Sequence, residues 1–303
     1  MKHYPVMLNE CITELNIKPD GIYIDATLGA GGHSFEIAKR LTEGKLIVFD
    51  KDHEALARGK AKLQAYEDNV IFMHRSYADI KTVVSELGLK GVDGILFDLG
   101  VSSPQFDDPK RGFSYRFDSR LDMRMDQRQS LSAYEVVNTY DEADLIRILQ
   151  EFGEERYAKK IVAEMIKARP ITTTFELVDV IKKAYPAYEL KKGHPARQTF
   201  QALRMEVNDE LKDLNQALEA AIEVINPKGR VVVLSFHSLE DRLVKQKFNA
   251  VGKKAKVNPR IPIPIEASLN YKVRKKGVKA SKEELAENSR SRSALLRSLE
   301  RMK

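Results

Sequence analysis

Short apolar runs alternate with segments of helical periodicity over the first hundred residues. The apolar runs occupy residues 22–28, 45–50, 70–74 and 92–99. The helical segments between them occupy residues 33–41, 53–66 and 78–87. Strands and helices that alternate at this spacing predict an α/β fold, in which helices cover both faces of a parallel sheet.

The alternation stops after residue 104, and residues 105–207 contain no strand-like run. Four helices are predicted there, over residues 142–152, 154–168, 175–184 and 199–207. The alternation then resumes with a helix (211–225), a strand (230–236), a helix (239–249), a proline-rich loop (253–264) and two strands (271–274 and 294–299). We therefore predict a discontinuous α/β domain, residues 1–104 and 208–303, that carries a helical insertion, residues 105–207.

Composition restricts the class of protein. The 303 residues are 43% hydrophobic, which is too high for a disordered chain and sufficient for a large core or two smaller ones. The longest aliphatic strand-like run, residues 231–234, is far too short to span a membrane, and the N-terminus lacks the apolar region of a signal peptide. The single cysteine, Cys11, excludes an internal disulfide framework and a cysteine-rich zinc site. A soluble, cytoplasmic protein without a membrane partner is expected.

The net charge of +7 is unevenly distributed. Residues 242–303 carry 18 basic and 5 acidic side chains, a net charge of +13, whereas the preceding residues carry a net charge of −6. Clustered cations bind polyanions because they release the counterions of the phosphates. The distribution slightly favours a nucleic-acid partner over a merely solvated basic tail.

A glycine-rich turn, residues 25–34 (DATLGAGGHS), follows the first predicted strand and opens a helix. Glycines at such a turn let the backbone approach a ligand closely. The turn is not a phosphate-binding loop, and Ser34 stands where a dinucleotide fingerprint has its third glycine. Asp25 precedes Gly29 and Gly31 by four and six residues, a pattern typical of S-adenosylmethionine-dependent methyltransferases, in which the acid orients the cationic end of the cofactor. The structural alternative is an ordinary glycine turn with a helix-capping acid.

Two further acids end predicted strands. Asp50 lies 19 residues beyond Gly31, where an acid accepts hydrogen bonds from ribose hydroxyls. Asp98 ends the fourth strand, at the edge where open α/β sheets bind ligands, and a carboxylate buried there needs a partner. The segment after Asp98 reads Ser-Ser-Pro-Gln and lacks the Asp/Asn-Pro-Pro-aromatic motif of many amino-group methyltransferases.

Longer motifs carry a family resemblance over nearly the whole chain. They are residues 3–10 (HYPVMLNE), 25–34, 98–107 (DLGVSSPQFD), 111–114 (RGFS), 121–126 (LDMRMD), 194–196 (HPA), 199–204 (TFQALR), 235–242 (SFHSLEDR) and 288–294 (NSRSRSA). Together they resemble the bacterial family of ribosomal RNA cytosine-N4-methyltransferases (RsmH, formerly MraW). Met205 and Ser289 are conservative departures from the pattern of that family.

The resemblance implies a class I methyltransferase with a Rossmann-like sheet, a helical insertion that recognises RNA, and S-adenosylmethionine as the cofactor. The reaction it implies is N4-methylation of a cytidine in small-subunit (16S) ribosomal RNA, either free or within the 30S particle, by a monomer or homodimer. The implied cofactor contacts are Gly31, Gly32, His33, Asp50, Tyr77, Asp98 and Gln105. The turn itself adds Asp25 and Gly29. Tyr77 is expected beside the adenine, and a core tyrosine is the equal alternative.

The chemistry of the target indicates candidate catalytic residues. A carboxylate that accepts a hydrogen bond from an exocyclic cytosine amine localises its lone pair and fixes its orientation. Asp98 is the predicted carboxylate, although it can serve the cofactor instead. His237 follows the strand at 230–236 and either contacts the base, takes a proton or is structural. Cys11 precedes the first strand, which disfavours carbon methylation through a cysteine nucleophile, and no residue spacing suggests a catalytic metal.

Aromatic and arginine side chains interleave in residues 106–128, as in surfaces that stack splayed bases and bind phosphates. The same segment holds six basic and five acidic residues, so several arginines can pair internally. The predicted RNA contacts are Arg111, Phe113, Arg116, Arg124, His194, Arg290 and Arg292.

Two other functions remain compatible with parts of the sequence. An NAD-dependent oxidoreductase would use the same sheet, but Asp25 and Ser34 count against it. A non-catalytic RNA-binding protein would need only the basic tail, and it would leave the glycine turn, Asp50 and Asp98 unexplained.

Overall fold

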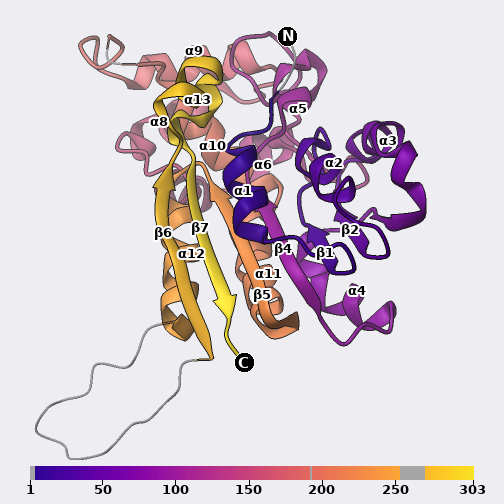
Figure 1. Cartoon of the computed structure of the whole chain (residues 1–303). Helices are drawn as coiled ribbons and strands as arrows, with labels where there is room; N and C mark the ends of the chain where they lie inside the picture. The colour runs from indigo at the N-terminus through magenta and orange to yellow at the C-terminus, as the bar shows by residue number, and fades with distance from the viewer. Residues whose placement is uncertain (1–3, 192, 253–269) are drawn as a thin grey trace, which may run out of the picture. The chain divides into compact units, whose positions relative to one another are not determined.

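The computed structural model describes residues 4–191, 193–252 and 270–303. The chain forms two compact units: the sheet unit comprises residues 1–100 and 212–303, and the helical unit comprises residues 101–211 (Figure 1). Each of the two boundaries between these units lies four residues from the domain boundary that the sequence predicts. The predicted proline-rich loop, residues 253–264, lies outside the described residues.

A seven-stranded sheet forms the centre of the sheet unit, in the order β3-β2-β1-β4-β5-β7-β6. Its strands are β1 (Ile22–Asp25), β2 (Lys45–Phe49), β3 (Val70–Met73), β4 (Val92–Asp98), β5 (Ile225–Ser235), β6 (Tyr271–Lys279) and β7 (Leu295–Arg301). Strands β1 to β5 are parallel, as predicted, but β7 is antiparallel to β5 and β6 is antiparallel to β7. The sheet is therefore mixed rather than fully parallel.

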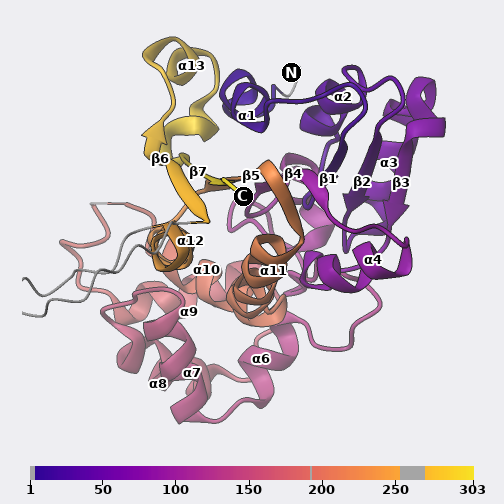
Figure 2. The same cartoon turned by 60° about the horizontal axis from the view of Figure 1, so that its bottom comes forward.

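Helices cover both faces of this sheet (Figure 2). One face packs against α1 (Leu8–Leu15), α2 (Gly32–Ala38) and α3 (His53–Lys62). The other packs against α4 (Ile80–Glu86), α11 (Glu210–Val224) and α12 (Ser238–Gly252). Alternate residues of β2 enter the two cores, since Leu46 and Val48 face the first and Ile47 and Phe49 the second. Burial on both faces explains why the parallel strands are continuous apolar runs in the sequence.

Helix α1 has no counterpart among the predicted elements. It is eight residues long, and the residues at both of its ends, Met7 and Asn16, have left-handed backbone conformations. No side chain caps its N-terminus, so it lacks the usual start signal of a helix. Its buried residues include Cys11 and Leu15, which join the core on the first face of the sheet.

The helical unit has a hydrophobic core of its own. Its helices are α5 (Ser103–Asp107), α6 (Ala133–Thr139), α7 (Glu142–Glu151), α8 (Ala158–Ala168), α9 (Thr174–Ala184) and α10 (Ala196–Val207). The four predicted helices correspond to α7 to α10, and the prediction missed the shorter α5 and α6. Helix α8 begins four residues later than predicted, because Glu154 adopts a left-handed conformation that interrupts the helical pattern.

Short 3₁₀ helices and one further α-helix complete the described elements. They are η1 (Gln64–Asn69), η2 (Tyr77–Asp79), η3 (Pro109–Arg111), α13 (Lys282–Glu287) and η4 (Ser289–Ser293). Among the described residues, no helix is long and apolar enough to cross a membrane.

Candidate active site

The carboxyl ends of the parallel strands carry the polar residues that the sequence singles out. In the sheet, β2, β1, β4 and β5 are successive neighbours, so the segments that follow them emerge along one edge (Figure 1). The glycine turn follows β1, Asp50 follows β2, Asp98 ends β4 and His237 follows β5. The sheet thus brings together four segments that are separated by up to two hundred residues of sequence.

Asp25 holds the glycine turn together from inside the protein. Its carboxylate accepts hydrogen bonds from the Ser34 hydroxyl at 2.5 Å and from the Thr27 backbone N–H at 3.1 Å. Burial raises the pKa of Asp25, whose exposed fraction is only 1%. Gly29 and Gly31 adopt left-handed conformations with φ of 50° and 69°, which explains the glycines at these positions. Asp25 therefore ties the two ends of the turn to each other and does not face the surface.

Asp50 connects the second strand to the same turn. One carboxylate oxygen accepts the Gly29 backbone N–H at 2.9 Å, and the other accepts the Asp52 backbone N–H at 2.8 Å. Burial raises the pKa of Asp50 to about 6, although both hydrogen bonds act in the opposite direction. Each oxygen retains a lone pair that can accept a further hydrogen bond from a ligand.

Tyr77 begins η2, just after β3, and its ring lies edge-on to Phe97 with the ring centroids 5.8 Å apart.

A polar network that was not predicted from the sequence involves Ser76, the residue before Tyr77. Asp213 accepts a hydrogen bond from the Ser76 hydroxyl at 2.6 Å and pairs with the Lys51 ammonium at 2.5 Å. Asp213 stands 137 residues after Ser76, so no local signal in the sequence connects them.

Asp98 is the partly exposed acid of the site, and His33 is its buried neighbour. The side chain of Asp98 is 27% exposed, and one of its oxygens lies 3.4 Å from Nδ1 of His33, whose side chain is 5% exposed. The Asp98 backbone N–H donates to the Thr27 hydroxyl at 2.7 Å. His33 Nε2 lies 3.1 Å from the Val6 carbonyl oxygen, which can only accept, so Nε2 carries a proton.

The protonation of His33 follows from its partners. Burial by itself lowers the pKa of His33, but hydrogen bonds with Asp98 and with the Cys11 thiol outweigh it and raise the pKa well above its usual value. The imidazole faces Asp98 on one side and the Val6 carbonyl on the other. The structure places His33 where it can orient Asp98, whereas the sequence predicted a direct cofactor contact.

His237 is held by an acid three residues further along the chain. Its Nε2 lies 3.0 Å from one oxygen of Glu240, and the backbone N–H groups of Phe236 and His237 donate to the other oxygen at 2.8 and 3.3 Å. Glu240 is 3% exposed. Glu240 lies in the motif at residues 235–242 and was assigned no role from the sequence; it binds the backbone at Phe236 and His237, whereas its approach to His237 Nε2 lacks the geometry of a hydrogen bond.

Several predicted residues of the helical unit stabilise the fold of residues 105–128. Gln105 is buried and its amide oxygen accepts hydrogen bonds from the backbone and hydroxyl of Ser102, which caps α5. Arg111 is 4% exposed and donates to the carbonyls of Arg124 and Met125 at 2.9 and 3.3 Å. Phe113 belongs to the hydrophobic core of this unit.

The burial of Arg111 and Phe113 corrects the expectation that their side chains reach RNA, since each has its partners inside the helical unit. Arg124 binds the Asp122 carboxylate through two nitrogens, at 2.7 and 2.9 Å, and donates to the Gln129 carbonyl. The internal pairing that the acidic residues of this segment allow therefore occurs.

Other predicted RNA contacts are exposed. Arg116 is exposed, and so is the neighbouring Phe117, with 41% of its surface accessible. The ring of His194 stacks on Tyr115 with the ring centroids 4.0 Å apart, and partial burial lowers the pKa of His194. In the sheet unit, Arg290 and Arg292 are exposed on η4.

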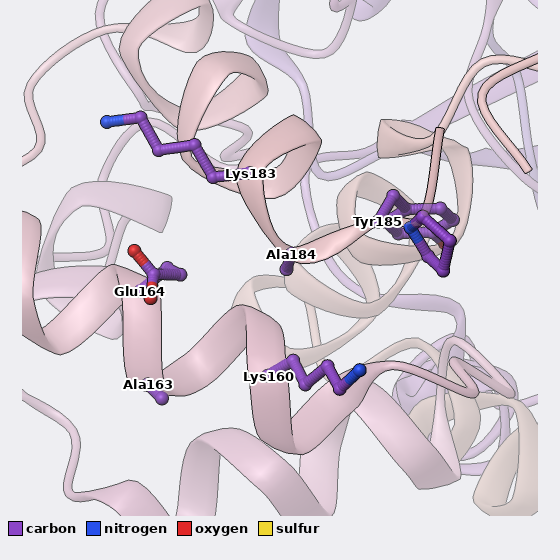
Figure 3. Close-up of a pocket in the computed structure, with 7 residues that line it drawn as sticks. Lys160, Ala163, Glu164, Lys183, Ala184 and Tyr185 are labelled. Carbon is purple, nitrogen blue, oxygen red and sulfur yellow. The ribbon is translucent and has the colours of Figure 1, made fainter. Parts of the chain in front are cut away.

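A separate pocket of about 480 Å³ lies in the helical unit, between α8 and the end of α9 (Figure 3). Its lining residues are Lys160, Ala163, Glu164, Lys183, Ala184, Tyr185 and Pro186. None of them is a predicted site residue. The lining combines two lysines with a carboxylate, and this mixed charge favours neither an anion nor a cation.

The chain is similar to known proteins over nearly its whole length. Residues 1–302 match the model of the MraW methylase family. The chain is 49% identical, over 98% of its length and 97% of the relative's, to "Ribosomal RNA small subunit methyltransferase H" from Clostridium botulinum (strain Kyoto / Type A2). The protein of the same name from the Loch Maree strain is 48% identical over the same shares. A solved rRNA methylase structure from Streptococcus thermophilus is 10% identical, with a TM-score of 0.44 and coverage of 100% of this chain and 99% of that one.

Proposed function

Because the chain belongs to the MraW methylase family, we propose that it methylates the N4 amine of a cytidine in small-subunit ribosomal RNA. S-adenosylmethionine is the methyl donor. The observation that carries the proposal is the near full-length similarity to relatives named ribosomal RNA small subunit methyltransferase H. Membership of a methylase family removes the oxidoreductase alternative.

The carboxyl edge of the sheet fits this cofactor. Asp50 has two oxygens that each hold one backbone N–H, which leaves acceptors for the two ribose hydroxyls. Gly31 adopts a left-handed conformation that other residues rarely adopt, so the turn presents backbone and no side chain at this position. Tyr77 follows β3, beside Asp50 along the edge, and is the candidate for the adenine contact. When bound, the cofactor supplies an electrophilic methyl group on its sulfonium.

In this proposal Asp25 acts on the turn rather than on the cofactor. It is buried and bound to Ser34 and Thr27, so its contribution is the shape of the loop. Gly29 and Gly32 then contribute to the site through the backbone conformation of the turn. His33 contributes through its contact with Asp98. Gln105 belongs to the helical unit, and we keep it as a proposed cofactor contact on the resemblance alone.

Asp98 is the proposed catalytic residue. The exocyclic amine of cytosine is a weak nucleophile because its lone pair is delocalised into the ring. A carboxylate that accepts a hydrogen bond from this amine localises the lone pair and turns it toward the methyl group. Asp98 is partly exposed at the strand end; His33 lies against its carboxylate, and the Thr27 hydroxyl holds its backbone N–H. His237, beside Glu240, is the proposed second group that contacts the base.

The position of Cys11 supports a nitrogen target. Methylation at pyrimidine C5 needs a cysteine thiol that attacks the ring. Cys11 is fully buried in the core on the first face of the sheet, where burial raises the pKa of its thiol. A buried thiol with a raised pKa is a poor nucleophile.

The helical unit is the proposed RNA-recognition unit, through Arg116, Phe117 and His194, which are exposed. The stacked pair of Tyr115 and His194 offers a flat surface of the kind on which unpaired bases stack. Arg290 and Arg292 extend the proposed RNA contacts to the sheet unit.

The test is methyl transfer from labelled S-adenosylmethionine to small-subunit rRNA, extracted from cells that lack this protein. Digestion to nucleosides and chromatography against standards should place the label in N4-methylcytidine. Label in 5-methylcytidine, in a ribose methyl group or in another base would overturn the proposal. Asp98→Asn should lower kcat by about 10²–10³-fold while cofactor affinity changes little, because it removes charge from the acceptor.

A further inference from the structure

The N-terminal motif and the motif at residues 288–294 meet at one side-chain amide. Asn288 donates from Nδ2 to the Tyr4 carbonyl oxygen at 3.1 Å. Its Oδ1 accepts the backbone N–H of Arg290 at 3.2 Å. One amide group therefore bridges the N-terminal motif and the C-terminal motif, which are 284 residues apart.

A carboxylate makes the second connection between these two motifs. One oxygen of Glu284 accepts both the Met7 backbone N–H at 2.6 Å and the Ser291 hydroxyl at 2.5 Å. Ser291 is 1% exposed, so this oxygen lies within the junction. The N-terminal segment is thus fixed to α13 and η4 at two points.

The junction rests on the glycine turn. Pro5 lies so close to Gly32 that a Cβ at Gly32 would be 2.2 Å from the Pro5 ring. The next carbonyl, that of Val6, lies 3.1 Å from His33 Nε2. The residue that precedes Pro5 is therefore displayed beside the turn that carries the proposed methyl donor.

Three side chains at this junction are exposed. The Tyr4 side chain is 60% exposed, although it is large and aromatic, and it belongs to none of the hydrophobic clusters among the described residues. Arg290 and Arg292 are exposed on the adjoining η4. The segment of residues 288–294 has no acidic residue, and Glu284 of the neighbouring helix is turned into the junction. The junction thus supplies one exposed aromatic ring, and η4 supplies two exposed guanidinium groups, and these two kinds of side chain together bind single-stranded nucleic acid.

We propose that Tyr4, Arg290 and Arg292 form a platform for an unpaired nucleotide of the RNA substrate, next to the target base. The base stacks on the Tyr4 ring, and the two guanidiniums bind the adjoining phosphates. This inference rests on the proposed function, because the RNA it binds is the one that is methylated. The platform assigns one shared role to the N-terminal and C-terminal motifs. The cofactor site alone gives these motifs no role at the surface.

Tyr4→Ala and Tyr4→Phe test the role of the ring while the junction stays intact, because Asn288 binds the backbone carbonyl of Tyr4 and not its side chain. The probe is small-subunit rRNA from cells that lack the protein, and its affinity is measured by filter binding. Stacking on one aromatic side chain accounts for about a 5- to 160-fold change in affinity, so Tyr4→Ala should weaken RNA binding within that range. Tyr4→Phe should bind nearly as the wild type does, and calorimetry should give both variants the wild-type affinity for S-adenosylmethionine.

Arg290→Gln with Arg292→Gln tests the binding of the phosphates. The slope of log affinity against log salt should fall by about 0.7 for each phosphate that the variant no longer binds. Lys90→Gln with Lys228→Gln is the matched control, since both lysines are exposed, they lie where β4 and β5 begin, at the edge of the sheet opposite the glycine turn, and the charge change is equal. The control should keep the wild-type slope.

The outcomes separate the platform from the proposed function. If the wild type methylates the rRNA and Tyr4→Ala binds it equally well, the platform is wrong and the function stands. A Tyr4→Ala variant that loses affinity for S-adenosylmethionine would also overturn the platform, because Tyr4 would then be structural. A wild type that binds this rRNA but transfers no methyl group to it would instead overturn the function.

Discussion

Asp50 predicts a pH dependence of cofactor binding. Its pKa is raised to about 6 by burial, and the backbone N–H groups of Gly29 and Asp52 donate to it. An ionised carboxylate accepts hydrogen bonds at both oxygens, whereas a protonated one has a hydroxyl that must donate. Affinity for S-adenosylmethionine should therefore be full above pH 6 and should fall as the pH is lowered through 6.

The size of the effect follows from the pKa. A group with a pKa of about 6 is about 97% ionised at pH 7.5 and about 9% ionised at pH 5. If only the ionised form accepts from both ribose hydroxyls, Kd rises about tenfold over this range, or about 1.4 kcal/mol. Asp50→Asn should weaken binding at pH 7.5 by about 1–3 kcal/mol, the scale for charge-assisted hydrogen bonds.

Calorimetric titration with S-adenosylmethionine from pH 5 to pH 7.5 checks the prediction in both proteins. Asp25 and His33, whose pKa values are also raised, are present in both the wild type and the Asp50→Asn variant. The difference between the two pH profiles therefore isolates the titration of Asp50. The profiles should converge near pH 5 and separate above pH 6. Parallel profiles, in a variant with the wild-type circular dichroism spectrum, would refute the assignment of Asp50 to the ribose.

Three further predictions concern single features of the structure. Cys11→Ser, which keeps a hydrogen-bonding group beside His33, should retain methyl transfer within about twofold, because a nitrogen nucleophile needs no enzyme thiol, and a hundredfold loss in a variant that still binds the cofactor would contradict this. Arg111→Met should lower the free energy of unfolding by about 2–4 kcal/mol in urea, since two carbonyls lose their buried donor, whereas an unchanged value would return Arg111 to the RNA surface. Lys276→Gln with Lys279→Gln, on the edge strand β6, should lower the salt slope of RNA binding by about 0.7–0.9 for each phosphate left unbound, and the wild-type slope would show that β6 does not bind RNA. Calorimetry should show unchanged cofactor affinity in this last variant, because salt screens exposed charges beyond about 8–10 Å.

The β6 prediction also shows how the structure separates basic residues that look alike in sequence. Lys275 Nζ lies 3.5 Å from the buried carboxylate of Glu14, whose other oxygen accepts the Ser298 hydroxyl. Lys276 and Lys279 are exposed. Lys275 and Lys276 are neighbours in a strand and so point to opposite faces, and the register shift between Lys276 and Val278 breaks strict alternation before Lys279.

Regular elements with strong local signals could be predicted from the sequence. Parallel strands buried on both faces are continuous apolar runs, and β1 to β4 occur where such runs predict them. Asp50 and Asp98 could be placed at one edge because parallel strands with helical crossovers present all their carboxyl ends on one side. The prediction missed α1, α5 and α6, whereas α2 and α4, which are equally short, were predicted because each lies between two predicted strands, where the alternation of strands and helices requires a helix.

By itself, then, the sequence determined the α/β class, the helical insertion and the positions of Asp50, Asp98 and the glycine turn, because each depends on local pattern and on the order of the strands. Only the tertiary structure decided which polar groups meet. The junction of Tyr4 with Asn288 spans 284 residues, and the pairing of His33 with Asp98 spans 65. Arg111 was predicted to bind RNA, but in the structure it is buried and donates hydrogen bonds to two carbonyls of its own loop. The physical reason is that burial of a polar group requires partners, and the fold, rather than the residues beside it in the chain, supplies them.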